Sequence, residues 1–478
     1  MMMAVQWVRN HIGFFGGNPY QIVVMGHGTG ASSALLVALT NVAKGYTNGV
    51  IALSGTAVSH WAVDNEPITT AREVADYQGC PTASALSMIK CLQQVPGTSV
   101  IQGDSYIANN RLQSRGFTSG LQGRLGSIPV TELQYDGRSL PPMVEGEPLD
   151  KMHHKEIPKI PLLTGVTKDE TKNAINGQYQ NDIKRQLRSI PHFLDNVLVK
   201  DLQSLTGLGR KGQNNESASG LWTLLEPLKF IKYTAVESVT EGLNKISEIT
   251  ADALFNLPAF LTANLWSKTG APVFLYRFEH SGKSKTARHF LKGLPIIGDY
   301  NISDTNNNTV GHGDDLIYLF EARSLNGTAI PDVEEDFTEN DRKVRDIFTE
   351  MISTFARHGR IDIDKKEIPS FSDKSNNYVQ ISARPKLLNN FRFCEMALWA
   401  GLTERLQSAA CSLLQVLDTQ LTNVGSVLLG TVDSAGSQII PGKPSLVGSA
   451  QQIGGNLGGI LNINMGGNKS NRGILGIL

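Results

Sequence analysis

The residues most suggestive of chemistry lie in the stretch VVMGHGTGASSALL, residues 23–36. In a G-x-S-x-G nucleophile elbow, a strand turns sharply into a helix and holds the central serine hydroxyl out for attack on a carbonyl. The spacing here places the outer glycines at Gly26 and Gly30, and Gly28 stands at the nucleophile position. Glycine has no side chain with which to attack an ester. The stretch therefore predicts the backbone of an elbow without its nucleophile.

Neighbouring hydroxyls offer no evident replacement for the missing serine. Thr29 is one residue past the tip, where its own N–H would be the remaining donor to an oxyanion. Ser32 and Ser33 fall about one turn along the following helix, several ångströms from the tip. The elbow also strains a non-glycine residue by about 1–3 kcal/mol, which glycine avoids. A Ser-to-Gly exchange would thus abolish catalysis and relax the turn.

The elements around this stretch predict a parallel sheet with flanking helices. A short buried strand at residues 21–25, a helix at 31–43 and a strand at 50–53 form a parallel βαβ unit. Further strands are expected at 160–166 and 273–278. Elsewhere the three- and four-residue spacing of apolar side chains predicts helices. These are the first segment, most of residues 195–268, and residues 341–358, which stop at Gly359.

Composition and charge exclude several classes of protein. Lys plus Arg and Asp plus Glu number 44 each, so the chain has no global electrostatic preference for nucleic acid or an anionic membrane. No apolar run reaches the roughly 18–20 residues of a membrane helix, so we predict no membrane span. The start, MMMAVQWVRNHIG, has no signal-peptide pattern and runs straight into a helix. We expect that the true beginning of the protein precedes it.

Cysteines and sequons indicate a secretory protein. Cys80 and Cys91 bracket the short segment CPTASALSMIKC, and a disulfide there would stabilise the fold by roughly 3 kcal/mol. Disulfides are typical of oxidising compartments. Candidate N-glycosylation sequons begin at Asn215, Asn301, Asn307, Asn326 and Asn468. We therefore predict a secreted glycoprotein, with its signal peptide lost together with the missing N-terminus.

The C-terminal part of the chain differs in composition from the rest. Its last segment, which includes IGGNLGGILNINMGGN, is rich in glycine, poor in charge, and lacks a helical or strand period. We predict a folded α/β domain at residues 1–405 and a partly disordered extension at 406–478. Self-association through the apolar residues of the extension is the alternative.

Seven segments, in order, resemble the type-B carboxylesterase and cholinesterase family of α/β-hydrolases. The resemblance implies an α/β-hydrolase fold, with a mostly parallel central sheet flanked by helices. It also implies that the N-terminal strands are lacking, together with a Gly-rich loop that donates two N–H groups to the oxyanion. The segments are WVRNHIGFFGGNPYQIVVMGHGTG, IALSGTAVSHWAV, YQGCPTASALSMIKCL, IPLLTGVTKDE, LFNLPAFLTANLWS, PVFLYRFEH and GHGDDLIYLF.

The resemblance assigns the other two positions of a Ser–acid–His triad. By position in GVTKDE the acid corresponds to Glu170, and by position in GHGDDLIYLF the histidine corresponds to His312. Thr171 follows the acid where the family often has Gly, and His27 stands where active members commonly have Glu. The triad would therefore be degenerate. No metal or other cofactor is expected.

The two remaining cysteines, Cys394 and Cys411, could pair or stay free. Members of the family often have Trp at the position of Cys394, which argues against a standard bridge. We also expect an open sheet edge where the N-terminal strands are lacking, and such an edge is an aggregation liability.

The resemblance implies a non-catalytic protein of adhesion or the extracellular matrix. The family includes non-catalytic members such as neuroligin, neurotactin, gliotactin and glutactin, and secreted glutactin is the nearest analogy to a chain without a membrane segment. The partner would be an extracellular or matrix protein. The alternative is a carboxylic ester hydrolase, or a protein that binds a hydrophobic ester in the family pocket. A third reading is a partial gene product that folds poorly.

Overall fold

The computed structural model describes most of residues 1–411. The predicted domain boundary, the five sequons and the Gly-rich extension lie outside the described residues, as does much of the helical prediction for residues 195–268. The described residues belong to one unit, Met1–Cys411. They are residues 1–64, 66–122, 126–132, 141–177, 179–186, 238–282, 308–321, 323, 337–400 and 411.

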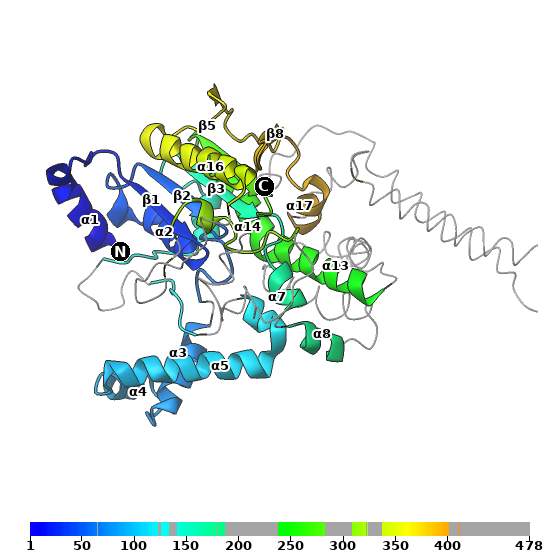
Figure 1. The fold of residues 1–478 in the computed structure, drawn as a ribbon. Helices are drawn as coiled ribbons and strands as arrows, with labels where there is room; N and C mark the ends of the chain where they lie inside the picture. The colour runs from blue at the N-terminus through cyan, green and yellow to red at the C-terminus, as the bar shows by residue number, and fades with distance from the viewer. Residues whose placement is uncertain are drawn as a thin grey trace, which may run out of the picture. The chain divides into compact units, whose positions relative to one another are not determined.

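A six-stranded sheet forms the centre of the structure, in the order β1-β2-β3-β4-β7-β8 (Figure 1). The first five strands run parallel, and β8 is antiparallel to β7. This confirms the predicted α/β fold with a mostly parallel sheet. The strands are β1 (Val23–His27), β2 (Gly49–Leu53), β3 (Leu162–Thr167), β4 (Val273–Phe278), β7 (Tyr378–Ile381) and β8 (Lys386–Leu388), and β5 (Asp362–Ile363) pairs with β6 (Lys366–Glu367) in a separate ribbon.

The central strands are continuous apolar runs because both of their faces are covered. Every residue of β2 and β3 is buried, whereas every residue of β1 is only half-buried. Among the described strands β1 pairs with β2 alone. This edge of the sheet is therefore open within the part of the chain that the structure describes, as expected.

Helices cover both faces of the sheet (Figure 1). On one face, α16 (Glu339–His358) buries Phe348, Met351 and Phe355 in a core cluster with alternate strand residues such as Ile51. On the other face, α2 (Thr29–Leu39) contacts β1 and β2, and α14 (Leu257–Ser267) contacts β3 and β4. The elbow lies between β1 and α2 and is thus fixed by two elements that pack on each other.

The sequence dictates where α16 begins and ends. The Thr338 hydroxyl accepts a hydrogen bond from the Asp341 N–H, and the Asp341 carboxylate accepts one from the Thr338 N–H, which is a capping box. Gly359 ends the helix with a φ of +64°. By contrast, α2 is shorter than predicted: it ends at Leu39 because Thr40 is extended.

The other helices follow the chain between and after the strands. They are α1 (Met2–His11), α3 (Pro67–Tyr77), α4 (Ala85–Leu92), α5 (Gly97–Gln122), α6 (Pro148–His153), α7 (Lys172–Asn176), α8 (Gln180–Gln186), α13 (Val239–Ala251) and α17 (Phe393–Ala400). Within the described residues, no helix combines the length and the apolar character needed to cross a bilayer.

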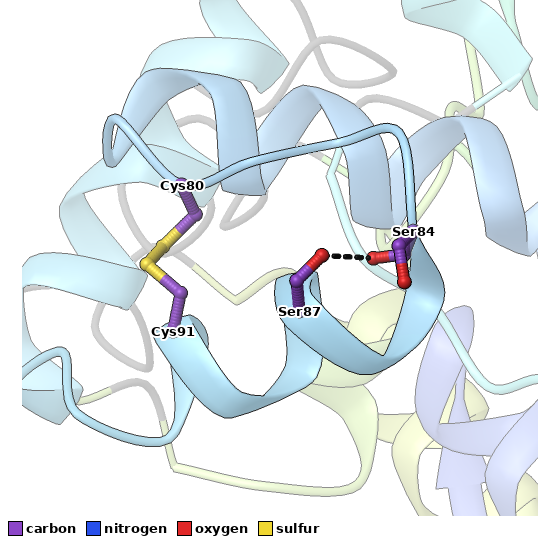
Figure 2. Close-up of a disulfide and its surroundings, with 4 residues drawn as sticks. All are labelled: Cys80, Ser84, Ser87 and Cys91. Atoms are coloured by element: carbon purple, nitrogen blue, oxygen red, sulfur yellow. Dashed lines mark hydrogen bonds between the residues drawn. A yellow bond between two sulfur atoms is a disulfide. The ribbon is translucent and has the colours of Figure 1, made fainter.

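Two disulfides join described residues. The predicted bridge between Cys80 and Cys91 ties the segment after α3 to the last turn of α4 (Figure 2). Cys394 and Cys411 are also bridged, with Cα atoms 5.4 Å apart, so the expectation against a bridge at Cys394 is wrong. The reason is local: Cys411, which follows α17 in the chain, is brought beside the start of this helix and is buried there.

Candidate functional site

The elbow adopts the sharp strand-to-helix turn that its glycines predict. Gly28 has φ +58° and ψ −120°, a conformation that strains residues with a Cβ. Its N–H donates to the Leu53 carbonyl at 2.8 Å. A Cβ at Gly26 would collide with the Gly30 backbone, so Gly26 allows α2 to leave β1 at this angle. The elbow is thus present and lacks only a side chain at its tip.

The acid and the histidine of the predicted triad lie together. Glu170 follows β3, His312 lies in the loop before a 3₁₀ turn at Leu316–Tyr318, and Nδ1 of His312 is 2.7 Å from Oε2 of Glu170. The other carboxylate oxygen accepts hydrogen bonds from the Ser54 hydroxyl at 2.6 Å and the Thr167 N–H at 2.7 Å. Glu170 is fully buried and His312 nearly so. A carboxylate held in this way fixes the imidazole with its Nδ1 proton on the glutamate side.

The free nitrogen of this dyad points at the empty tip of the elbow. A Cβ built on Gly28 would lie 3.2 Å from Nε2 of His312. In a working triad the nucleophile stands between the histidine and the oxyanion donors. The structure therefore brings all three triad positions together, with a hydrogen atom where the nucleophile would be.

Nearby hydroxyls are engaged elsewhere. Ser32 Oγ accepts a hydrogen bond from Nε1 of Trp61 at 3.0 Å and donates to the Gly28 carbonyl. Ser54 is hydrogen-bonded to the acid and not to the histidine. Thr29 is the first residue of α2, where a backbone N–H has no partner within the helix, so its role as an oxyanion donor stays a prediction. None of these observations supplies a nucleophile.

His27, half-buried at the end of β1, and the fully buried Asp315 form a second pair that the sequence did not reveal. The His27 ring lies 4.5 Å from the His312 ring, and its Nε2 is 3.8 Å from Oδ1 of Asp315. Burial, and then His312, lower the pKa of His27 well below 6.5. Burial, and then the charge of Glu170, raise the pKa of Asp315 to about 7. Sequence reasoning singled out His27 only as a departure from the family, and Asp315 stood unremarked beside the His312 motif.

Aromatic side chains close in on the dyad. The Phe255 ring is 5.1 Å from the His312 ring and 5.0 Å from the Trp61 ring. Phe255 belongs to a one-turn π-helix, Asp252–Asn256, between α13 and α14. Such π-bulges are frequent at functional sites. Among the described residues, no group of three or more His, Cys, Asp or Glu side chains is arranged to hold a metal ion.

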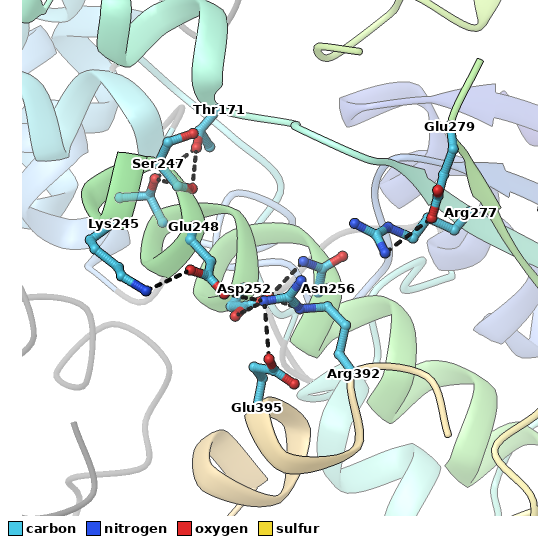
Figure 3. A network of polar contacts seen from close by, with 11 residues as sticks. Thr171, Lys245, Ser247, Glu248, Asp252, Asn256, Arg277, Glu279, Arg392 and Glu395 are labelled. Carbon is cyan, nitrogen blue, oxygen red and sulfur yellow. Dashed lines mark hydrogen bonds and ion pairs between the residues drawn. The ribbon is translucent and has the colours of Figure 1, made fainter. Parts of the chain in front are cut away.

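The π-helix is anchored by an ion-pair network (Figure 3). Arg392 contacts both carboxylate oxygens of Asp252, at 2.5 and 2.7 Å, and Oε1 of Glu248 at 3.1 Å. Asn256 donates a hydrogen bond to Asp252 at 2.7 Å. Asp252 has no exposed surface, so its charge depends on these partners.

The His27–Asp315 pair predicts two opposite pH dependences of stability. Because the pKa of Asp315 rises from 3.8 to about 7 on folding, the folded chain holds a proton that the unfolded chain releases between these values. The free energy of unfolding then falls as pH rises through this window, by up to about 1.4 kcal/mol per pH unit. The pKa of His27 is lowered, so below pH 6.5 unfolding takes up a proton and stability rises with pH.

We therefore expect the two contributions to oppose each other in the parent chain and to separate in single variants. Asp315→Asn should leave a free energy of unfolding that rises more steeply towards pH 6.5. His27→Gln should leave one that falls more steeply towards pH 7. Urea unfolding across this range measures both, and all other titrating groups are common to the two variants. Equal slopes in the two variants would contradict the prediction.

Comparisons with known proteins agree with the geometry. The profile described as "Carboxylesterase family" matches residues 1–399. The chain is 24% identical to human neuroligin-2 over 426 residues, which is 85% of this chain and 45% of that protein. It is 24% identical to mouse neuroligin-3, with 85% of this chain and 45% of that protein covered. It is 21% identical to rat carboxylesterase 1E, with 84% of this chain and 63% of that protein covered.

The chain spans about half the length of the neuroligins that it matches. Both an esterase and neuroligins are among the relatives, so similarity alone does not distinguish a catalytic protein from a non-catalytic one. The chain belongs to the carboxylesterase family.

Proposed function

We propose that this chain is a non-catalytic carboxylesterase-family protein that acts through its surface, in adhesion or in binding to the extracellular matrix. The observation that carries the proposal is Gly28 at the tip of a well-formed elbow. A Cβ at this position would lie 3.2 Å from Nε2 of His312, which is hydrogen-bonded to Glu170. Losing the nucleophile of a triad removes on the order of 10⁶ in kcat. The scaffold is kept and the reacting atom is not.

We infer a secreted location, which fits this function. The two disulfides are typical of a protein that folds in an oxidising compartment. The sequence similarity to neuroligins points in the same direction, because the family resemblance places neuroligins among its non-catalytic members. We therefore propose a secreted glycoprotein whose partner is an extracellular or matrix protein.

Two measurements on the full 478-residue chain test the proposal. The parent chain should neither hydrolyse a short nitrophenyl ester nor form an adduct with an organophosphate, and a label on any elbow residue would contradict it. The chain coated on beads should bind a panel of immobilised matrix proteins or intact cells, and Gly28→Ser should bind equally. If the folded chain bound none of the matrix proteins and no cells, an adhesive role would be rejected.

The second candidate is a binder of hydrophobic esters. Phe255 and Trp61 form an apolar wall beside His312, which is the feature such a ligand would use. Saturable binding of a hydrophobic ester without turnover, weakened in Phe255→Ala, would favour this candidate. Binding that is unchanged in Phe255→Ala would place the ester elsewhere.

A further inference from the structure

A pocket of about 470 Å³ lies between α3 and α5, away from the dyad. Three of its lining residues come from α3 and four from α5, and none belongs to the elbow or the dyad. Its volume is within the range of about 300–1,000 Å³ that is usual for binding sites. The helices that form it are held together with α4 and the Cys80–Cys91 disulfide (Figures 1 and 2).

Two tyrosines form an exposed aromatic wall in this pocket. The rings of Tyr77 and Tyr106 lie with their centroids 4.7 Å apart and their planes at 32°. Their exposed fractions are 46% and 50%, so much of their ring surface is presented to solvent. Ile107, which is 5% exposed, also lines the pocket and adds apolar surface to it. Ring faces of this kind attract cations through their quadrupole.

The position of Tyr77 depends on the close packing of α3 against α5. A Cβ at Gly103 of α5 would lie 2.8 Å from Cδ1 of Tyr77, closer than real Cβ contacts allow. Glycine inside a helix is unfavourable, yet at this position it lets α5 approach the Tyr77 ring. The position of that ring therefore depends on the packing of the two helices.

Among the charged lining residues that the structure describes, one carboxylate is in excess. Arg111 is largely buried, and its Nε and Nη2 lie 2.9 and 2.6 Å from Oε2 of Glu73. Glu73 is thus compensated within the pocket. Asp76 is exposed at the rim and joins no salt bridge with the described residues. The described lining residues therefore present a ligand with a net negative charge beside two aromatic rings.

We propose that this pocket binds a guanidinium or ammonium group, supplied by an arginine or lysine side chain of a partner protein. An anion would be repelled by Asp76, and a purely apolar ligand would leave the polar lining without partners. A cation gains from the ring faces and from the carboxylate together. The tyrosines open the pocket to solvent, where a side chain projecting from another protein can enter. The proposal does not depend on whether the elbow is catalytic.

Calorimetric titration of the full chain with a tetra-arginine peptide, beside N-ethylguanidinium as the free cation, tests this assignment. We expect the peptide to bind more tightly than N-ethylguanidinium. We expect Tyr77→Leu and Tyr106→Leu to weaken peptide binding by about fivefold each, and Tyr77→Phe to retain it because the ring face remains. Asp76→Asn should weaken binding, whereas Glu350→Gln removes an exposed charge from the distant α16 and should leave it unchanged.

Three outcomes would overturn the proposal. The first is that the peptide does not bind the parent chain. Asp76→Asn and Glu350→Gln could weaken binding equally, which would indicate non-specific charge attraction. N-ethylguanidinium could bind as tightly as the peptide, which would assign the pocket to a free small cation and not to a partner protein. Because Tyr77→Phe and Asp76→Asn change only exposed groups, the test does not depend on the folding of the leucine variants.

Discussion

Gly28→Ser is expected to form a covalent adduct with an organophosphate at position 28, whereas the parent chain forms none. The Cβ of the new side chain would start 3.2 Å from Nε2 of His312, whose other nitrogen is held 2.7 Å from Glu170. The hydroxyl would therefore enter an oriented base–acid pair after a small shift of His312. Intact-protein mass spectrometry before and after incubation with the organophosphate measures the adduct.

Ester turnover should recover far less than labelling. Restoring the nucleophile can return on the order of 10⁶ in kcat, but each missing oxyanion donor costs about 10²–10³. The family resemblance implies that two such donors come from a Gly-rich HGGG-type loop, and no HGGG sequence occurs in these 478 residues. We therefore expect hydrolysis of a nitrophenyl ester by Gly28→Ser to exceed that of the parent by no more than about 100-fold.

The variant should also be less stable than the parent. A residue with a Cβ at φ +58° costs about 1–3 kcal/mol, and the 3.2 Å contact requires His312 to yield by a few tenths of an ångström. Gly28→Ala is the matched control, because it carries the same strain and no hydroxyl. Adding His312→Gln to Gly28→Ser should abolish labelling. An adduct that survives in this double variant, or none in a folded Gly28→Ser chain, would contradict the prediction.

Much of the sheet could be predicted because its strands are locally encoded. The run VFLYRF is mostly apolar, short and bounded by turn residues, and the structure has β4 at these six positions. The elbow could be predicted equally well, since the sharp strand-to-helix turn of a nucleophile elbow requires glycines at fixed spacing. Local patterns of this kind need no knowledge of the rest of the chain.

The contacts of the site were not encoded in this way. Glu170 and His312 are 142 residues apart, and only the family resemblance placed them together. Nothing local indicates that Ser54 donates to Glu170 or that His27 faces Asp315. Both contacts arise where loops meet at the carboxyl ends of the parallel strands. The Cys394–Cys411 bridge was missed for a related reason: the family position suggested a tryptophan, and the pairing depends on where the chain after α17 returns.

The largest loss of stability is expected from Arg392→Met. Asp252 is fully buried, and Arg392 contacts both of its carboxylate oxygens. Breaking a buried ion pair by removing one partner costs about 3–5 kcal/mol, because the remaining charge is left in a low-dielectric environment. Urea unfolding followed by tryptophan fluorescence measures the change. Since Asp252 opens the π-helix that carries Phe255, the aromatic contact with His312 should loosen as well.

Two further variants separate the buried charge from the loss of the arginine side chain. Arg323→Met removes a guanidinium from an exposed pair with Glu321, and such pairs contribute only about 0–1 kcal/mol. Arg392→Met combined with Asp252→Asn removes both charges, so it should regain most of the stability that Arg392→Met loses. If the double variant were as unstable as the single one, packing of the arginine stem and not charge would anchor the π-helix. If Arg392→Met cost no more than Arg323→Met, the network would not anchor it at all.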